Sequence, residues 1–186
     1  MRITGGTLKG RRVEVPEGII RPSMDRMRES VFAVLGDLSG CSFLDVFTGT
    51  GIIALEAASR GADYIEAVEM DPIKRKTLLK NAALSPVRIN CHFMAAELYV
   101  KRAKRDFDII FCDPPFPYRF KWELISAIAA SPLVKEGTQI LLHRPRQDYH
   151  DAPIPFIQKE NVREYGRSIV DFFRITGKTE IYGQKP

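Results

Sequence analysis

The tetrapeptide at positions 113–116 has the residue types needed to handle an aromatic amine. It reads Asp113-Pro114-Pro115-Phe116 and follows an apolar run. The lone pair of an aryl amine is delocalised into its ring, so the amine is a poor nucleophile. Acceptors around the amino hydrogens hold the nitrogen in a more tetrahedral arrangement and aim its lone pair at an electrophile. The Asp113 carboxylate and the Pro114 carbonyl are two such acceptors, and the carboxylate also stabilises the positive charge that develops on nitrogen.

The rest of the tetrapeptide fits the same chemistry. Paired prolines have a fixed φ and no N–H, so the turn is stiff and presents carbonyls rather than donors. Phe116 offers a face on which an extruded base can stack. The alternative is an ordinary Pro-Pro turn after a strand, capped by Asp113. The position of this turn, beside a second group of functional residues, favours the catalytic interpretation.

That second group is a glycine turn between a predicted strand and a predicted helix. It reads Asp45-Val46-Phe47-Thr48-Gly49-Thr50-Gly51. Glycines let the backbone approach a ligand without a Cβ in the way. A dinucleotide site tolerates Ala54 in place of its third glycine, but the Asp45 carboxylate repels a pyrophosphate. The same carboxylate suits the cationic amino group of S-adenosylmethionine.

The methyl donor implied by this turn is already activated as a sulfonium. The protein therefore needs no metal and no covalent nucleophile, and its main task is to align donor and acceptor. Glu69, at the end of the next predicted strand, can accept hydrogen bonds from both hydroxyls of the cofactor ribose. The cofactor-binding residues expected from these two strand ends are Asp45, Phe47, Gly49, Gly51, Glu69 and Met70.

Hydrophobic periodicity predicts regular alternation of strands and helices. The strands are expected at 43–47, 64–69, 87–93, 107–112 and 139–143, the helices at 23–38, 52–59, 71–84, 95–103 and 120–130, and a closing hairpin lies within 162–175. Alternation of this kind implies an α/β fold, a parallel sheet with helices on both faces. Ligands then bind at the carboxyl ends of the strands. Ser23 and Asp71 are expected to cap their helices.

Composition limits the class of protein. The 186 residues are 45% hydrophobic and 27% charged, which suits one globular domain. The formal net charge is +5, and the first 28 residues carry +4 of it, which favours a polyanionic partner. The three cysteines and three histidines lack metal-ligand spacing. No signal core or membrane-spanning stretch is evident, so a cytoplasmic location is expected.

Several short motifs together resemble the RsmD family of bacterial enzymes, which methylate N2 of a guanine in 16S ribosomal RNA. The motifs are Arg2-Ile3-Thr4-Gly5-Gly6, Lys9-Gly10-Arg11, Arg21-Pro22-Ser23-x-Asp25-Arg26-x-Arg28-Glu29-x-x-Phe32, the Asp45–Gly51 turn, Leu55-Glu56-Ala57-x-Ser59-Arg60-Gly61-Ala62, the 113–116 tetrapeptide and Tyr165-Gly166-x-Ser168. Their combined order carries the resemblance, which covers nearly the whole chain.

The resemblance implies a class I, Rossmann-like S-adenosylmethionine-dependent methyltransferase fold, with a seven-stranded sheet and an antiparallel terminal strand. It implies a β-hairpin extension at residues 1–22 and a methyltransferase domain at residues 23–186. Residues 21–29, with Arg28, would close the cofactor pocket near its methionine end. The substrate would be 16S rRNA, in the small ribosomal subunit or its precursor, and the protein is expected to be a monomer. Related enzymes often bind adenine with Asp or Asn after the third strand, where this chain has Met94, Ala95 or Ala96.

Three alternatives stay open at this point. An adenine-N6 DNA methyltransferase would use the same tetrapeptide, although the chain lacks room for a DNA target-recognition domain. A nicotinamide oxidoreductase would use the glycine turn but would leave the Asp113 turn unexplained. A non-catalytic RNA-binding module would account for the basic N-terminal segment and predicts RNA binding without methyl transfer.

Overall fold

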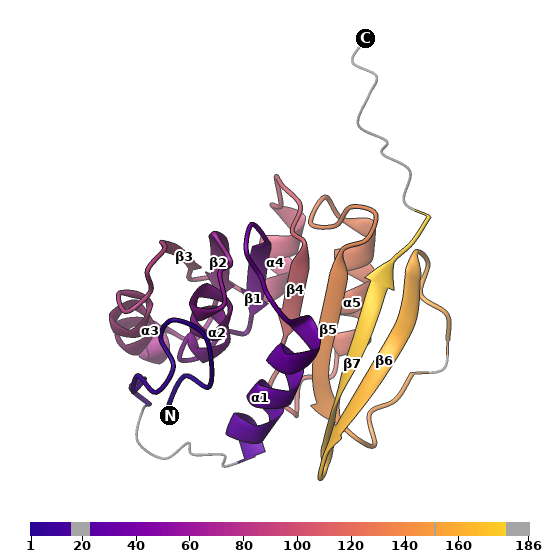
Figure 1. The fold of residues 1–186 in the computed structure, drawn as a ribbon. Helices are drawn as coiled ribbons and strands as arrows, with labels where there is room; N and C mark the ends of the chain where they lie inside the picture. The colour runs from indigo at the N-terminus through magenta and orange to yellow at the C-terminus, as the bar shows by residue number, and fades with distance from the viewer. Residues whose placement is uncertain (16–22, 151, 178–186) are drawn as a thin grey trace.

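A computed structural model describes residues 1–15, 23–150 and 152–177 and contains one seven-stranded sheet (Figure 1). The strand order is β3-β2-β1-β4-β5-β7-β6. The strands are β1 (Ser42–Val46), β2 (Tyr64–Val68), β3 (Ile89–His92), β4 (Ile109–Cys112), β5 (Gln139–Pro145), β6 (Ile157–Tyr165) and β7 (Ser168–Ile175). Strands β1 to β5 pair in parallel, whereas β7 is antiparallel to both β5 and β6. The predicted Rossmann-like sheet with a closing hairpin is therefore confirmed.

Helices cover both faces of the sheet, as the strand–helix alternation predicts (Figure 1). They are α1 (Ser23–Leu35), α2 (Ile52–Ser59), α3 (Arg75–Ala82), α4 (Ala96–Lys101) and α5 (Lys121–Ala130). A short 3-10 helix, η1 (Pro72–Lys74), precedes α3, and the Asp71 side chain caps it by accepting a hydrogen bond from the Ile73 N–H at 3.0 Å. The predicted cap at Ser23 concerns a side chain outside the described part of the chain.

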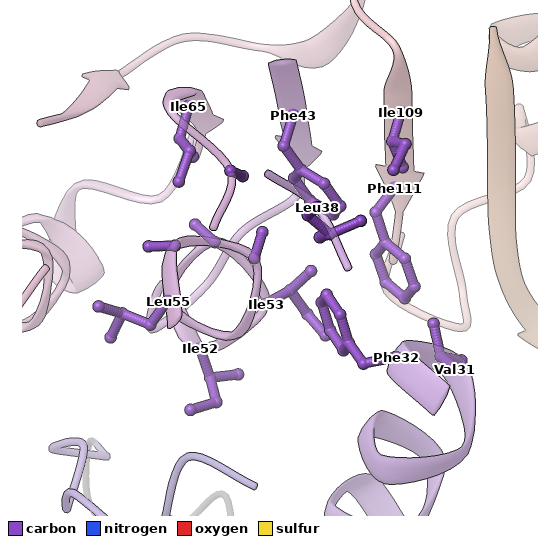
Figure 2. Packing of buried hydrophobic residues seen from close by; sticks show 14 of the residues in the cluster. Val31, Phe32, Leu38, Phe43, Ile52, Ile53, Leu55, Ile65, Ile109 and Phe111 are labelled. Atoms are coloured by element: carbon purple, nitrogen blue, oxygen red, sulfur yellow. The ribbon is translucent and has the colours of Figure 1, made fainter. Parts of the chain in front are cut away.

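Two hydrophobic clusters hold these layers together. The first lies between the sheet and helices α1 and α2, where side chains from β1, β4, α1 and α2 meet (Figure 2). The rings of Phe32 and Phe43 stack there with centroids 6.2 Å apart, and neither residue is more than 1% exposed. The second cluster lies on the opposite face under α4 and α5 and includes Phe107 and Ile125. Because both faces are covered, every residue of the central strands β1 and β4 is buried, rather than every second one.

The register of the sheet brings the ends of four strands to one edge. Val46 of β1 lies beside Val68 of β2 and Cys112 of β4, and Cys112 lies beside Leu142 of β5. The chain order reverses between β1 and β4, so this edge is the topological switch point at which open α/β sheets bind ligands. The residues that come next at this edge are Phe47, Glu69, Asp113 and His143.

The N-terminal segment turns back on itself but forms only part of a hairpin. The Ile3 N–H donates to the Arg11 carbonyl at 3.0 Å, and a single antiparallel bridge joins Arg2 to Arg12. Regular paired strands are absent from residues 1–15. The side chains of Leu8 and Val13 are buried in the first hydrophobic cluster, so this segment packs on the domain. Residues 16–22, with the predicted boundary, lie outside the described residues.

The contact between this segment and α2 yields a stability prediction. Gly6 has φ +74°, and an added Cβ would lie 1.8 Å from the Ser59 carbonyl oxygen. We expect Gly6→Ala to lower the free energy of unfolding by about 2–4 kcal/mol, because both the backbone strain and the clash must be relieved. Urea unfolding measures the change. Gly10→Ala is the matched control, since Gly10 has φ +83° with open space around it, and it should cost only about 1–2 kcal/mol.

Candidate functional site

The glycine turn after β1 uses an unusual backbone conformation. Phe47, Gly49 and Gly51 all have positive φ, at 65°, 58° and 80°. A Cβ on Gly51 would lie 2.8 Å from Leu78 Cδ1 of α3, so a side chain there would have to displace this buried leucine and also adopt a positive φ. A bulky residue such as Phe47 rarely adopts positive φ, and such strain concentrates at functional sites. The turn is thus shaped for close approach of a ligand, at a cost in backbone strain.

Asp45 lies at the floor of this turn and has one unused oxygen. Its side chain is fully buried, and its Oδ2 accepts hydrogen bonds from the Thr48 hydroxyl and from the Ala54 N–H at 3.1 Å. The other oxygen, Oδ1, is buried without a hydrogen-bond partner among the described residues. Burial raises the pKa of Asp45 to about 7, although the two hydrogen bonds act in the opposite direction. A buried acceptor of this kind is costly unless a partner satisfies it, and a cationic ligand would do so.

Glu69 connects the glycine turn to the end of β2. Its Oε2 accepts from the Gly49 N–H at 2.9 Å, and its Oε1 accepts from the Asp71 N–H at 2.8 Å. The Lys74 ammonium lies 3.5 Å from the same Oε2. These bonds fix the carboxylate in one orientation, and Oε1 keeps a lone pair for a further donor. The position and fixed orientation suit a contact with vicinal hydroxyls.

Two cavities meet at this edge of the sheet. The first has a volume of about 290 Å³, and its lining includes three carboxylate residues, Asp45, Glu69 and Asp113. The second has a volume of about 500 Å³, and Met94 and Ala96 are part of its lining. The residues that line both cavities are Phe47, Glu69, Lys74 and Pro115. An elongated ligand can therefore run through both cavities past Glu69, with one end at Asp45.

The Asp113 turn lies against the glycine turn, as the sequence predicts. The Asp113 N–H donates to the Val46 carbonyl at 3.2 Å, which fixes the start of the turn beside β1. Asp113, Pro114 and Pro115 line the first cavity, whereas Phe116 does not. The Phe116 ring instead packs edge-on against His143 at 5.7 Å between centroids and lines a separate surface depression. Three residues of the tetrapeptide thus share a cavity with Asp45, and the fourth lies beside it.

His143 is the main site residue that the sequence did not reveal. Its Nδ1 lies 2.7 Å from Asp113 Oδ1, and its Nε2 lies 2.9 Å from Ser168 Oγ. The imidazole is almost completely buried. The sequence does contain one indication of this role. The strand predicted at 139–143 ends at His143, and the carboxyl ends of parallel strands lie at the same edge as Asp113. Thr48 and Lys74 were likewise missed, although both follow predicted strands closely.

Two residues expected at the cofactor differ in where the structure places them. Met70 is 68% exposed and lines only the second cavity. Arg28 lines neither cavity and is fully buried. Its guanidinium bonds to Glu56 Oε1 at 3.0 Å and to the Arg2 carbonyl at 2.8 Å, and it contacts the Met1 sulfur at 3.6 Å. Arg28, which lies on α1, thus binds both the N-terminal segment and α2. Its contact with Met1 connects it to the first cavity, because Met1 lines that cavity.

The arrangement fits S-adenosylmethionine by its own chemistry. The unsatisfied Asp45 oxygen suits a cationic amino group, the fixed Glu69 carboxylate suits ribose hydroxyls, and the largely apolar second cavity suits a base. In the second cavity, Met94 and Ala96 line the place where an acidic or amide side chain is expected, and neither side chain has a group that bonds with adenine. Glu97, which follows directly, lines the same cavity and carries a carboxylate.

The described part of the chain has neither a cluster of metal ligands nor a membrane-crossing helix. No group of three or more His, Cys, Asp and Glu side chains is arranged to hold a metal ion in residues 1–15, 23–150 and 152–177. Within the same ranges, no helix has both the length and the apolar character needed to cross a membrane.

Known proteins resemble this chain both in sequence and in fold. The chain is 34% identical to ribosomal RNA small subunit methyltransferase D of Escherichia coli strain K12 over 122 residues, which is 62% of this chain and 60% of that protein. It is 30% identical to the Bacillus subtilis protein YlbH over 156 residues, covering 79% and 84% of the two chains. The solved structure of the Escherichia coli protein yhhF superposes with a TM-score of 0.84 at 25% identity, covering 95% of this chain and 98% of that one.

The matched segment spans less than two thirds of the Escherichia coli enzyme, so that match alone does not transfer an activity. The family match is broader. A family model described as Conserved hypothetical protein 95 matches residues 1–174, from the N-terminal segment to the end of β7. The chain therefore belongs to this family, which is the RsmD family that its motifs resemble.

Proposed function

We propose that the protein transfers a methyl group from S-adenosylmethionine to the exocyclic N2 of a guanine in 16S ribosomal RNA. One observation carries the proposal: Asp45 and Asp113, two carboxylates with different surroundings, line one cavity at the topological switch point together with Glu69. Asp45 is buried with an unsatisfied oxygen, and Asp113 opens a stiff Pro-Pro turn. Relatives named ribosomal RNA small subunit methyltransferase D, from Escherichia coli and Haemophilus influenzae, support the rRNA substrate.

The residues of the chain divide the reaction between them. The cofactor supplies a methyl group on a sulfonium, so the chain needs no activating nucleophile. Asp45 would hold the amino group of the methionine moiety and Glu69 the ribose, which fixes the methyl group in the first cavity. Asp113 and the Pro114 carbonyl would accept hydrogen bonds from the guanine amino group and align its lone pair with the methyl carbon. After transfer the amine loses one proton, which goes to the Asp113 carboxylate or to water.

The N-terminal segment offers a surface for the RNA backbone. Lys9, Arg11 and Arg12 are exposed, and no acidic side chain among the described residues pairs with them. This basic segment lies beside the first cavity, which Met1 lines. Phosphate contacts fix position and orientation without reading sequence. We therefore assign the segment a positioning role for an RNA substrate presented by the small subunit or its precursor.

Adenine N6 is the second candidate for the acceptor atom. The chain is 35% identical over 77 residues to a tRNA1(Val) (adenine(37)-N6)-methyltransferase of Cytophaga hutchinsonii, a match that covers 40% of this chain and 32% of that enzyme. The Asp113 turn grips an exocyclic amino group and does not itself distinguish the two bases. The longer matches to small-subunit rRNA enzymes support rRNA as the substrate, and the resemblance to the RsmD family implies guanine as the base.

A labelling experiment tests the proposal. The protein is incubated with methyl-labelled S-adenosylmethionine and, in parallel, naked 16S rRNA, small ribosomal subunits, tRNA and DNA, and the products are digested to nucleosides. We expect labelled N2-methylguanosine from the small-subunit arms. Labelled N6-methyladenosine would support the adenine alternative instead. RNA binding with no label in any arm would point to a non-catalytic module.

Cofactor affinity provides a separate test of Glu69. We expect Glu69→Ala to weaken S-adenosylmethionine binding about 10- to 100-fold, because hydrogen bonds to a carboxylate contribute about 1.5–3 kcal/mol and the Gly49 contact is lost as well. Isothermal titration calorimetry measures the change. Glu69→Gln is the matched control, since it keeps one acceptor oxygen and the side-chain volume, and its loss should be smaller. Unchanged affinity in Glu69→Ala would remove Glu69 from the cofactor site.

A further inference from the structure

We propose that His143 is a positioning residue for the methyl transfer: it orients the Asp113 carboxylate and supports Phe116. The Ser168 hydroxyl stabilises the imidazole tautomer that donates its Nδ1–H to Asp113. The inference rests on the proposed function, because it assigns a role to the surroundings of the same catalytic turn. It concerns a side chain on β5 and another on β7, two strands that carry none of the residues identified from the sequence motifs as catalytic.

A continuous chain of hydrogen bonds runs from the catalytic turn into the sheet. Asp113 Oδ1 lies 2.7 Å from His143 Nδ1, and His143 Nε2 lies 2.9 Å from Ser168 Oγ. In the antiparallel β5–β7 register, His143 lies opposite Val170 and Pro145 opposite Ser168. His143 and Ser168 are therefore diagonal neighbours on one face of the sheet. Because the imidazole and the serine are both buried, water does not compete for these bonds.

The pairing fixes the tautomer of the imidazole. A carboxylate only accepts hydrogen bonds, so His143 donates its Nδ1–H to Asp113. In the neutral ring Nε2 is then an acceptor, and the Ser168 hydroxyl is placed to donate to it. The Ser168 oxygen also lies 3.3 Å from the Tyr165 carbonyl, a second acceptor to which the hydroxyl can turn. Asp113 thus selects the ring form with a proton on Nδ1, and the Ser168 hydroxyl stabilises that form where it donates to Nε2.

The two oxygens of Asp113 consequently have different roles. Oδ1 is engaged by His143, whereas no donor among the described residues bonds to Oδ2. The Asp113 side chain is 21% exposed and lines the first cavity. With Oδ1 fixed, the carboxylate cannot rotate freely, and Oδ2 is the oxygen left to accept a hydrogen bond from the amino group of the substrate. An orientation set in advance lowers the entropic cost of aligning the amine.

The same imidazole also contacts the other end of the tetrapeptide. The Phe116 ring packs edge-on against the His143 ring, with centroids 5.7 Å apart and planes at 66°. Such edge-to-face pairs contribute about 0.5–1.5 kcal/mol beyond the area they bury. One buried side chain on β5 therefore supports both Asp113 and Phe116, the first and last residues of the turn, while the prolines between them keep it stiff.

The experiment compares two substitutions that differ in one hydrogen bond. His143→Leu removes the donor to Asp113, whereas His143→Asn keeps an N–H donor near the Nδ1 position. We expect His143→Leu to lower kcat about 10- to 100-fold with little change in the KM for S-adenosylmethionine, and His143→Asn to recover most of that loss. His92→Leu is the matched control, because His92 also pairs with a carboxylate, Glu66 Oε2 at 2.6 Å, but lines neither cavity.

A second measurement does not depend on activity. The nitrogen chemical shifts of ¹⁵N-labelled histidine should show a protonated Nδ1 and an unprotonated Nε2 at His143, and Ser168→Ala should disturb this pattern. The opposite tautomer, or equal kcat in His143→Leu and the wild type, would overturn the inference. Equal losses in His143→Leu and His143→Asn would do so too, since they would indicate a packing role. If Asp113→Ala stayed active, the proposed catalytic function itself would fail, which is a different result.

Discussion

Replacing Asp113 with alanine is expected to abolish measurable methyl transfer, a loss of about 1000-fold or more, while S-adenosylmethionine affinity stays nearly unchanged. The substitution removes an acceptor for the amino hydrogens and the negative charge that stabilises the developing positive nitrogen, and effects of this kind reach about 10²–10⁴-fold. Asp45 and Glu69 are assigned to the amino group and the ribose of the cofactor, so the loss of Asp113 should lower the rate but not the cofactor affinity. Single-turnover transfer and calorimetry measure the two quantities.

Two variants separate the contributions of Asp113. Asp113→Asn keeps an acceptor oxygen but loses the charge, so it should fall between the wild type and Asp113→Ala. Asp106→Ala is the matched control, because Asp106 precedes the same strand at its opposite end, where it pairs with Lys135 at 2.9 Å. Full activity in Asp113→Ala would remove this carboxylate from catalysis. Equal loss in Asp106→Ala would show that the effect comes from the stability of the strand.

Local patterns were sufficient to predict most of the fold. The apolar runs at 43–47 and 107–112 and the helical periodicity at 52–59 lie close to β1, β4 and α2 in the structure. These elements are buried on both sides, so the strength of their hydrophobic pattern reflects the final packing directly. The carboxyl-edge rule then placed the glycine turn and the Asp113 turn together without knowledge of any side-chain contact.

Contacts that depend on tertiary register could not be predicted in the same way. His143 meets Asp113 only because β4 and β5 are in parallel register, and it meets Ser168 only because β7 returns antiparallel beside β5. Neither register is encoded near residue 143. Phe116 illustrates the same limit. Its aromatic ring was expected to stack on a base, but the direction of the ring, toward His143 and outside the first cavity, depends on the neighbouring strand.

Arg28 was expected at the cofactor pocket, but its contacts in the structure give it a structural role. The guanidinium is buried against Glu56, which also accepts a hydrogen bond from the Thr4 N–H at 2.9 Å and pairs with Arg60. A buried carboxylate is costly unless several donors surround it. Removing one of these partners would leave its charge uncompensated. The cluster attaches the N-terminal segment to α2, and α2 begins directly after the glycine turn. Arg28 can thus support the site from a position outside its cavities.

Asp45 provides the second strong prediction, a cofactor affinity that depends on pH. Burial raises the pKa of Asp45 to about 7 in the free protein, so its carboxyl group is mostly protonated below that pH. Only the ionised form pairs with an ammonium group. Binding below pH 7 must therefore release a proton, and the affinity should fall about tenfold for each pH unit below 7. Above about pH 8 the α-amino group of the ligand loses its own charge, so the affinity should be greatest between these values.

Asp45→Asn tests this assignment because it removes the charge at nearly constant volume. We expect the affinity at pH 7.5 to fall about 10²–10⁴-fold, since loss of one partner from a buried ion pair costs about 3–5 kcal/mol. In Asp45→Asn the affinity should no longer fall below pH 7, and binding should no longer release a proton. Calorimetry in buffers of different ionisation enthalpy measures that proton release. S-adenosylhomocysteine is a matched ligand, because it keeps the amino group and lacks the sulfonium charge, and its affinity should show the same dependence on pH. A wild-type affinity that stays constant from pH 6 to 7.5 would place the ammonium group away from the orphaned Asp45 oxygen.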